Sequence, residues 1–190
     1  PFINIFPMKR IIFAVLLIGI VSCTQKNKFT IEGHVDGAEG ELIYLEHTGL
    51  STSTLLDSMV VKSDGSFRFK APRPEYPDFY KLILKGKQLH FAVDSTETLE
   101  ISATLEEFTT NYEIKGSDTN SDIQTLRRSV AAIQKKANEL IRGTDEATRA
   151  AIVAELTRMI DEHKAMARPL ILKNPRSAAA YFAIFQKVND

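Results

Sequence analysis

The chain has 190 residues, and its 24 basic and 24 acidic side chains give a formal net charge of zero at pH 7. It therefore lacks the strong basic excess that nucleic-acid binding requires. Cys23 is the only cysteine. A single thiol excludes an intramolecular disulfide, a Cys-x-x-Cys redox pair and a cysteine-based zinc cluster within these residues.

The N-terminal residues have the order of a secretory signal. Met8-Lys9-Arg10 is a positively charged start, the run from Ile11 to Val21 is apolar, and Ser22 is a small residue before Cys23. The apolar run is too short to cross a bilayer, which takes about 20 residues. Residues 20–23 (Ile-Val-Ser-Cys) resemble the lipobox of bacterial lipoproteins. The resemblance implies lipidation of Cys23, with an unmodified cysteine after an ordinary signal peptide as the alternative.

These features predict four segments. Residues 1–22 are upstream residues and a lipoprotein signal peptide, because the chain starts with Pro1 and Met8 is the natural start. Residues 23–28 are a polar tether, residues 29–117 a β domain, and residues 118–190 a helical segment. The apolar stretch 181–188 lies almost at the end of the sequence. We therefore expect the helical segment to be truncated before another domain.

Residues 29–117 alternate between apolar and polar side chains, with turn residues every eight to twelve positions. This pattern is typical of an all-β sandwich or barrel. We expect an antiparallel β-sandwich of about eight strands, at residues 29–35, 42–45, 55–61, 66–70, 79–84, 88–93, 98–103 and 111–115.

Asp64-Gly65 is a hairpin signal between the third and fourth of these strands. A three-residue loop at 63–65 would place Val61 opposite Phe67 and Met59 opposite Phe69 on one face. A two-residue loop would oppose Lys62 to Phe67. The pattern favours the longer loop, with Gly65 in a left-handed conformation.

After Gly116 the apolar period changes to three and four residues, which is typical of helices. We expect an α-helical hairpin and a third helix, and hence an α+β fold with the β module first. Four sets of end signals bound these helices. Ser121 with Gln124 forms a capping box, Gly143 is the C-cap of the first helix and Thr144 the N-cap of the second. Pro169 is a stop, and Asn174-Pro175 starts the third helix.

The residues that could carry chemistry do not form a recognisable site. The four histidines, His34, His47, His90 and His163, have no His-x-His or His-x-x-x-His spacing. No Gly-x-Ser-x-Gly elbow and no phosphate-binding glycine loop occurs. We therefore predict no catalytic, cofactor-binding or metal-binding residue and no cofactor. His163 falls on an apolar helical stripe, where a hydrogen-bonded core or interface histidine is expected.

Three further features have both a structural and a functional interpretation. Asp57-Ser58 interrupts an apolar strand, and we favour a strand edge or bulge over a ligand contact. The basic pairs at Lys85-Gly86-Lys87 and Arg127-Arg128 indicate a hairpin tip and a solvated helix face. The aromatic residues Tyr181, Phe182 and Phe185 favour packing on a missing partner over a ligand site.

Five short motifs occur in the order of a known domain: residues 29–33 (Phe-Thr-Ile-Glu-Gly), 42–45 (Leu-Ile-Tyr-Leu), 56–58 (Leu-Asp-Ser), 64–69 (Asp-Gly-Ser-Phe-Arg-Phe) and 116–117 (Gly-Ser). Together with the lipobox they resemble the uncharacterised N-terminal β domain of Bacteroidetes thiol:disulfide interchange lipoproteins, of the TlpA/ResA-like, AhpC/TSA-related class. Residues 174–182 also look like the helical connector of those proteins. In that class a thioredoxin-like domain with a Trp-Cys-x-x-Cys site follows. The chain has no Trp and no second Cys, so no catalytic residue is carried over.

The resemblance implies an N-terminal accessory region of a membrane-anchored periplasmic thiol:disulfide oxidoreductase, acting as a spacer, in dimerisation or in client binding. Its expected partners are the membrane through lipid on Cys23, a protein client or its own thioredoxin-like domain, and a second copy in a homodimer, with no nucleic acid. The chain is expected to be exported and lipid-anchored to a bacterial membrane, facing the periplasm. The alternative is a stand-alone lipoprotein that binds a glycan or a protein.

Overall fold

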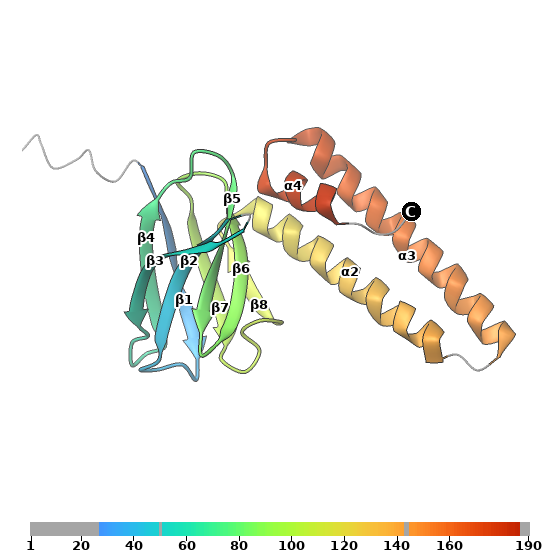
Figure 1. The fold of residues 1–190 in the computed structure, drawn as a ribbon, viewed down its shortest axis with the longest axis horizontal. Coiled ribbons are helices and arrows are strands. Elements are labelled where there is room, and N and C mark those ends of the chain that lie inside the picture. Colours follow the sequence, from blue (N-terminus) through green and yellow to red (C-terminus); the bar gives the residue numbers. More distant parts are fainter. Residues whose placement is uncertain (1–26, 50, 143–144, 187–190) are drawn as a thin grey trace, which may run out of the picture.

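The computed structural model describes residues 27–49, 51–142 and 145–186. A β-sandwich is followed by three helices, so the predicted α+β fold is confirmed (Figure 1). The strands are β1 (Lys28–Asp36), β2 (Leu42–Thr48), β3 (Ser53–Val60), β4 (Ser66–Pro72), β5 (Asp78–Leu84), β6 (Lys87–Val93), β7 (Thr98–Thr104) and β8 (Tyr112–Lys115).

The eight strands form two sheets of four, in the orders β4-β1-β7-β8 and β3-β2-β5-β6. Every pairing is antiparallel except that of β1 with β7, which is parallel, with Thr30 opposite Thr98. The expectation of a purely antiparallel sandwich is therefore wrong at this pair. Strand alternation cannot reveal the direction of a neighbour that lies about 70 residues away along the chain.

The alternation that predicted the strands also defines the core. Phe29 and Ile31 of β1 and Leu82 and Leu84 of β5 have no exposed side-chain surface. The ring centroid of Tyr80 lies 4.9 Å from that of Phe29 and 5.9 Å from that of Phe91. Burial, together with the nearby carboxylate of Asp78, raises the pKa of Tyr80 to about 12. The sandwich thus closes around residues that alternate along facing strands.

The turn after β3 has the predicted loop but not the predicted hairpin. Gly65 has a φ of 77°, and its N–H donates to the Lys62 carbonyl at 2.9 Å. Beyond the turn, however, β3 and β4 enter different sheets. Val61 donates its N–H to the Glu41 carbonyl at 2.9 Å instead of pairing with Phe67. Both Val61 and Phe67 are buried, so the shared face that predicted a hairpin is the core between the two sheets.

Three helices follow: α2 (Asp118–Arg142), α3 (Glu146–Lys173) and α4 (Ala178–Phe185). Helix α2 starts before the predicted capping box, because the Ser117 hydroxyl accepts the N–H of Asn120 at 3.3 Å. Gly143 and Thr144 lie outside the described residues. The N-cap of α3 is Asp145, which accepts the N–H of Thr148 at 2.8 Å, so the predicted cap at position 144 is wrong by one residue.

The predicted stop at Pro169 is wrong, because Pro169 lies inside α3. Proline removes one backbone hydrogen bond from a helix. Here packing continues across it, since Ala167, Leu170 and Ile171 contact a cluster that includes Leu126 of α2. The predicted start at Asn174-Pro175 is also wrong: Asn174 is the C-cap of α3, and Ser177 caps α4.

Asn120, near the start of α2, joins the helices to the sandwich. Its Oδ1 accepts the N–H of Ala92 and its Nδ2 donates to the carbonyl of Ala92, both at 2.8 Å. The amide thus pairs with edge strand β6 as a neighbouring strand would. Asp94 accepts the hydroxyl of Thr119 with one oxygen and the N–H of Ala178 at 3.1 Å with the other. One carboxylate therefore holds the N-termini of both α2 and α4.

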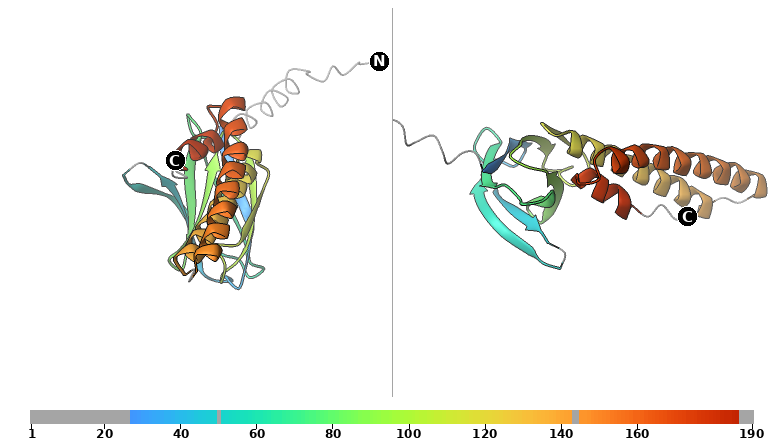
Figure 2. Two further views of the ribbon diagram at one scale, coloured as in Figure 1. Left: turned by 90° about the vertical axis from the view of Figure 1, so that its right-hand side faces the viewer. Right: turned by 90° about the horizontal axis from the view of Figure 1, so that it is seen from above.

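Beyond this junction the α2–α3 hairpin projects from the sandwich (Figures 1 and 2). We call residues 127–142 of α2 and 145–162 of α3 the helical arm. None of the described helices is long and apolar enough to cross a membrane.

Asn120→Ala should destabilise the fold by about 3 kcal/mol, because it leaves two buried backbone groups of Ala92 without partners. Urea unfolding followed by circular dichroism measures this change. Asn138→Ala is the matched control, since Asn138 is exposed and its side chain accepts a hydrogen bond from Gln134 of its own helix, at 3.3 Å. Equal unfolding free energies for the two variants would contradict the role assigned to Asn120.

Candidate functional site

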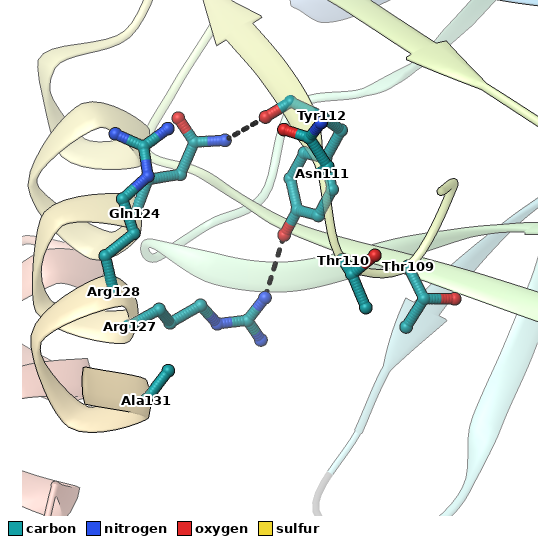
Figure 3. A pocket seen from close by; sticks show the side chains of 8 residues that line it. All are labelled: Thr109, Thr110, Asn111, Tyr112, Gln124, Arg127, Arg128 and Ala131. Carbon is teal, nitrogen blue, oxygen red and sulfur yellow. Dashed lines mark hydrogen bonds between the residues drawn. The ribbon is translucent and has the colours of Figure 1, made fainter. Parts of the chain in front are cut away.

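A polar groove lies where α2 passes the segment between β7 and β8 (Figure 3). Its volume is about 310 Å³. Its lining residues come from two separate parts of the chain: Thr109, Thr110, Asn111 and Tyr112 on one side, and Gln124, Arg127, Arg128 and Ala131 on the other.

Tyr112 and Arg127 are held in place by a chain of hydrogen bonds. The Tyr112 hydroxyl donates to the carbonyl of His90 at 3.0 Å and accepts from Nη1 of Arg127 at 2.8 Å. The Arg127 guanidinium also lies 5.6 Å from the ring centroid of Phe182, within the range of a cation–π interaction. Gln124 donates from Nε2 to the carbonyl of Tyr112 at 3.1 Å. The groove is therefore built on fixed contacts between α2, β8 and α4.

The groove is rich in hydrogen-bond donors and has positive charge. None of its lining residues is acidic, and neither Arg127 nor Arg128 forms an ion pair with any residue that the structure describes. Burial, and then the charges of Arg127 and Lys81, lower the pKa of His90 behind it. Guanidinium, amide and hydroxyl groups in this arrangement suit a carboxylate or another anionic group.

The four histidines lie apart. His34 and His47 each contact an aspartate at 2.7 Å, Asp36 and Asp78 respectively. His163 is buried, with 2% of its surface exposed, and its Nδ1 lies 3.1 Å from the hydroxyl of Ser129 on α2. The prediction of a hydrogen-bonded interface histidine is confirmed there. Within the described ranges, no group of three His, Cys, Asp or Glu side chains is arranged to hold a metal ion.

Asp57 occupies the predicted strand edge. It lies exposed on β3, an edge strand whose register with β2 shifts between Leu45 and Glu46. Its Oδ1 accepts the N–H of Ser58 at 2.8 Å. The structural interpretation of Asp57-Ser58 as an edge and bulge is confirmed.

Some of the other predicted features are confirmed and some are wrong. Lys85-Gly86-Lys87 forms the tight connection between β5 and β6, as expected. Arg128 is exposed as predicted, but Arg127 is half-buried in the groove, so a solvated face is wrong for that residue. Phe182 packs into the helical core, whereas Tyr181 and Phe185 are 56% and 73% exposed. Cys23, the predicted lipidation site, lies outside the described residues.

Sequence reasoning missed Thr109, Thr110, Asn111 and Gln124 as groove residues. They are ordinary polar residues of a loop and a helix, and only the fold brings them together. The one available signal is that Arg127 directly follows buried Leu126 and lies four residues after buried Ile123. That position is beside the apolar stripe and not opposite to it.

The described residues define a β-sandwich protein with a helical extension and a polar groove at their junction. A model of the domain of unknown function DUF4369 matches residues 29–123, half of the chain, and the chain belongs to this family. The match spans the sandwich and the first residues of α2.

Similarity to solved structures is low. The chain is 15% identical to (S)-allantoin synthase, with a TM-score of 0.34, over 57% of this chain and 50% of that one. It is 16% identical to 5-hydroxyisourate hydrolase from Klebsiella pneumoniae, with a TM-score of 0.32, over 47% of this chain and 99% of that one. The chain thus spans half the length of the allantoin synthase. A search of curated proteins finds no match. These structural similarities support no functional argument.

His163→Gln should reduce the loss of stability on acidification. Burial lowers the pKa of His163 below its ordinary value of 6.5, so the unfolded chain binds a proton that the folded chain resists. The contribution of neutral His163 is complete above pH 6.5 and declines as the pH falls below it. Urea unfolding at several pH values between about 8 and 5 measures the slope. An unchanged slope in the variant would contradict this account; His90, whose pKa is also lowered, remains in both proteins.

Proposed function

We propose that this chain is the accessory, non-catalytic region of a lipid-anchored periplasmic thiol:disulfide oxidoreductase. The sandwich and the helical arm position a thioredoxin-like domain and provide contacts for other proteins. The chemistry, attack of a thiolate on a client disulfide, belongs to that further domain and to no residue of this chain.

The observation that carries the proposal is the exposed apolar surface of α4. Tyr181, Ile184 and Phe185 are 56%, 56% and 73% exposed on an eight-residue helix. Exposed apolar clusters of this kind mark interaction sites. The α4 N-terminus is tied to the sandwich through Asp94, so a domain resting on α4 would be held at a defined place. The ordered motifs and the lipobox in the sequence support the class of that domain.

A second candidate is a stand-alone binding module, and the polar groove favours it. Arg127 is fixed and has no acidic partner among the described residues, so an anionic group of a glycan or a protein would find a prepared site. The two candidates differ in what the gene encodes downstream. A reading frame that continues beyond Asp190 and encodes Trp-Cys-x-x-Cys supports the oxidoreductase. A stop codon soon after Asp190 supports the binding module.

Residues 24–190 alone should not reduce insulin disulfides in the presence of dithiothreitol above the rate without protein. The sequence from Thr24 onward contains no cysteine, and disulfide exchange needs a thiolate. Insulin turbidity measures the rate, with thioredoxin as the positive control. Reduction by this fragment would overturn the assignment of the chemistry to another domain.

Cys23→Ser should abolish incorporation of lipid. In cells fed an alkyne analogue of palmitate, the wild-type protein should become labelled and the variant should not, because serine cannot replace the modified thiol. Two or more acyl chains hold a protein on a membrane stably, whereas one gives only marginal binding. Ser22→Ala is the control, since it keeps a small residue before the cysteine. Equal labelling of wild type and Cys23→Ser would contradict the lipoprotein assignment.

A further inference from the structure

The helical arm has no buried core of its own. Among its described residues, 127–142 and 145–162, not one side chain is buried. The apolar residues between the two helices are only half-buried: Val130, Ile133, Ala137 and Leu140 on α2, and Ile152, Leu156 and Met159 on α3. Two helices alone leave one side of their apolar seam uncovered, and stable bundles add further helices.

The apolar stripe of each helix is also wider than one neighbour can cover. On α3, Val153 and Ile160 form a second row beside the row that faces α2, and Val153 is 49% exposed. On α2, Ile141 continues the row of Ala137 and is 83% exposed. A stripe of this width is typical of a helix that packs against two neighbours.

Charge is divided between the two helices of the arm. The α2 part carries five basic residues and one acidic residue, and the α3 part carries five acidic and two basic residues. Within one chain this division already forms an ion pair across the hairpin, since Nζ of Lys136 lies 2.8 Å from Glu155. The net charges of the two helices therefore favour a partner that presents acidic charge to α2 and basic charge to α3.

We propose that the partner is a second copy of this chain. In this dimer the two arms lie side by side and point the same way. Helix α2 of each copy packs against α3 of the other, and the four helices form a bundle. Neighbouring helices then alternate in direction, as in up-down-up-down bundles. Each basic α2 meets an acidic α3, and the two-fold axis brings the exposed rows that contain Ile141 and Val153 into the interface.

The same arrangement disfavours the other ways of pairing two arms. Contact of α2 with α2 would face two basic helices, and contact of α3 with α3 would face two acidic ones. The inference deepens the proposed accessory role by naming its dimerisation surface. It does not depend on a downstream oxidoreductase domain, so the insulin assay and the experiment below can fail independently.

Sedimentation equilibrium of residues 24–190, which contain every described strand and helix, tests the proposal. We expect a dimer for this polypeptide. Val153→Glu should raise the dissociation constant about 100-fold, because it buries an unpaired charge in the interface. Val153 is already 49% exposed in the single chain, so the variant should keep its circular dichroism spectrum.

Val60→Glu is the matched control. Val60 is 55% exposed on edge strand β3, so the chemical change is the same on a surface outside the arm. The dissociation constant should then equal that of the wild type. If the wild type sediments as a monomer at all concentrations, the proposal is overturned and the arm is assigned to contact with a different protein. Dissociation by Val60→Glu but not by Val153→Glu also overturns it and assigns dimerisation to the β3 edge.

Discussion

The position of the helices depends on one buried amide. Asn120 forms hydrogen bonds with both the N–H and the carbonyl of Ala92 on edge strand β6. Without Asn120 these two backbone groups would be unpaired at the edge of the sheet. Because the amide is buried and bonded to both groups of Ala92, it fixes the start of α2 against the sandwich. Asp94 does the same for α4. Apolar packing of Ala92 with Ile123, Ala178 and Ala179 supports both contacts.

The groove is a consequence of the same junction. As α2 leaves Asn120, its next turns pass the start of β8, so that Gln124 and Arg127 reach Tyr112. Phe182 of α4 closes the other side of Arg127. A change at the junction would thus alter the groove and the arm together, since Arg127, Arg128 and Ala131 belong to both. The guanidinium of Arg127 thus contacts both the groove wall at Tyr112 and Phe182 of α4.

Sequence patterns predicted the strands well, because each strand has one face in a shared core and its apolar residues repeat every second position. They failed where the information lies in distant residues. Val61 and Phe67 share a core face but belong to opposite sheets, and β7 joins β1 in parallel from far along the chain. The helix ends were predicted wrongly because other signals replaced the expected ones. Ser117 and Ser177 cap α2 and α4, and α3 continues to pack on α2 beyond Pro169. The groove could not be predicted, since its two sides meet only in the fold.

The parallel pairing of β1 and β7 determines when the sandwich can close during folding. β1 lies inside its sheet, and its two neighbours, β4 and β7, begin at residues 66 and 98. Until both neighbours have joined it, the first strand has an open edge and an apolar face that is not fully covered. Gly33 in its middle must also admit the backbone of Ile101, whose carbonyl oxygen would lie 1.8 Å from an added Cβ. The earliest strand in the chain is therefore among the last to be enclosed, and until then its open edges and apolar face are available for wrong contacts.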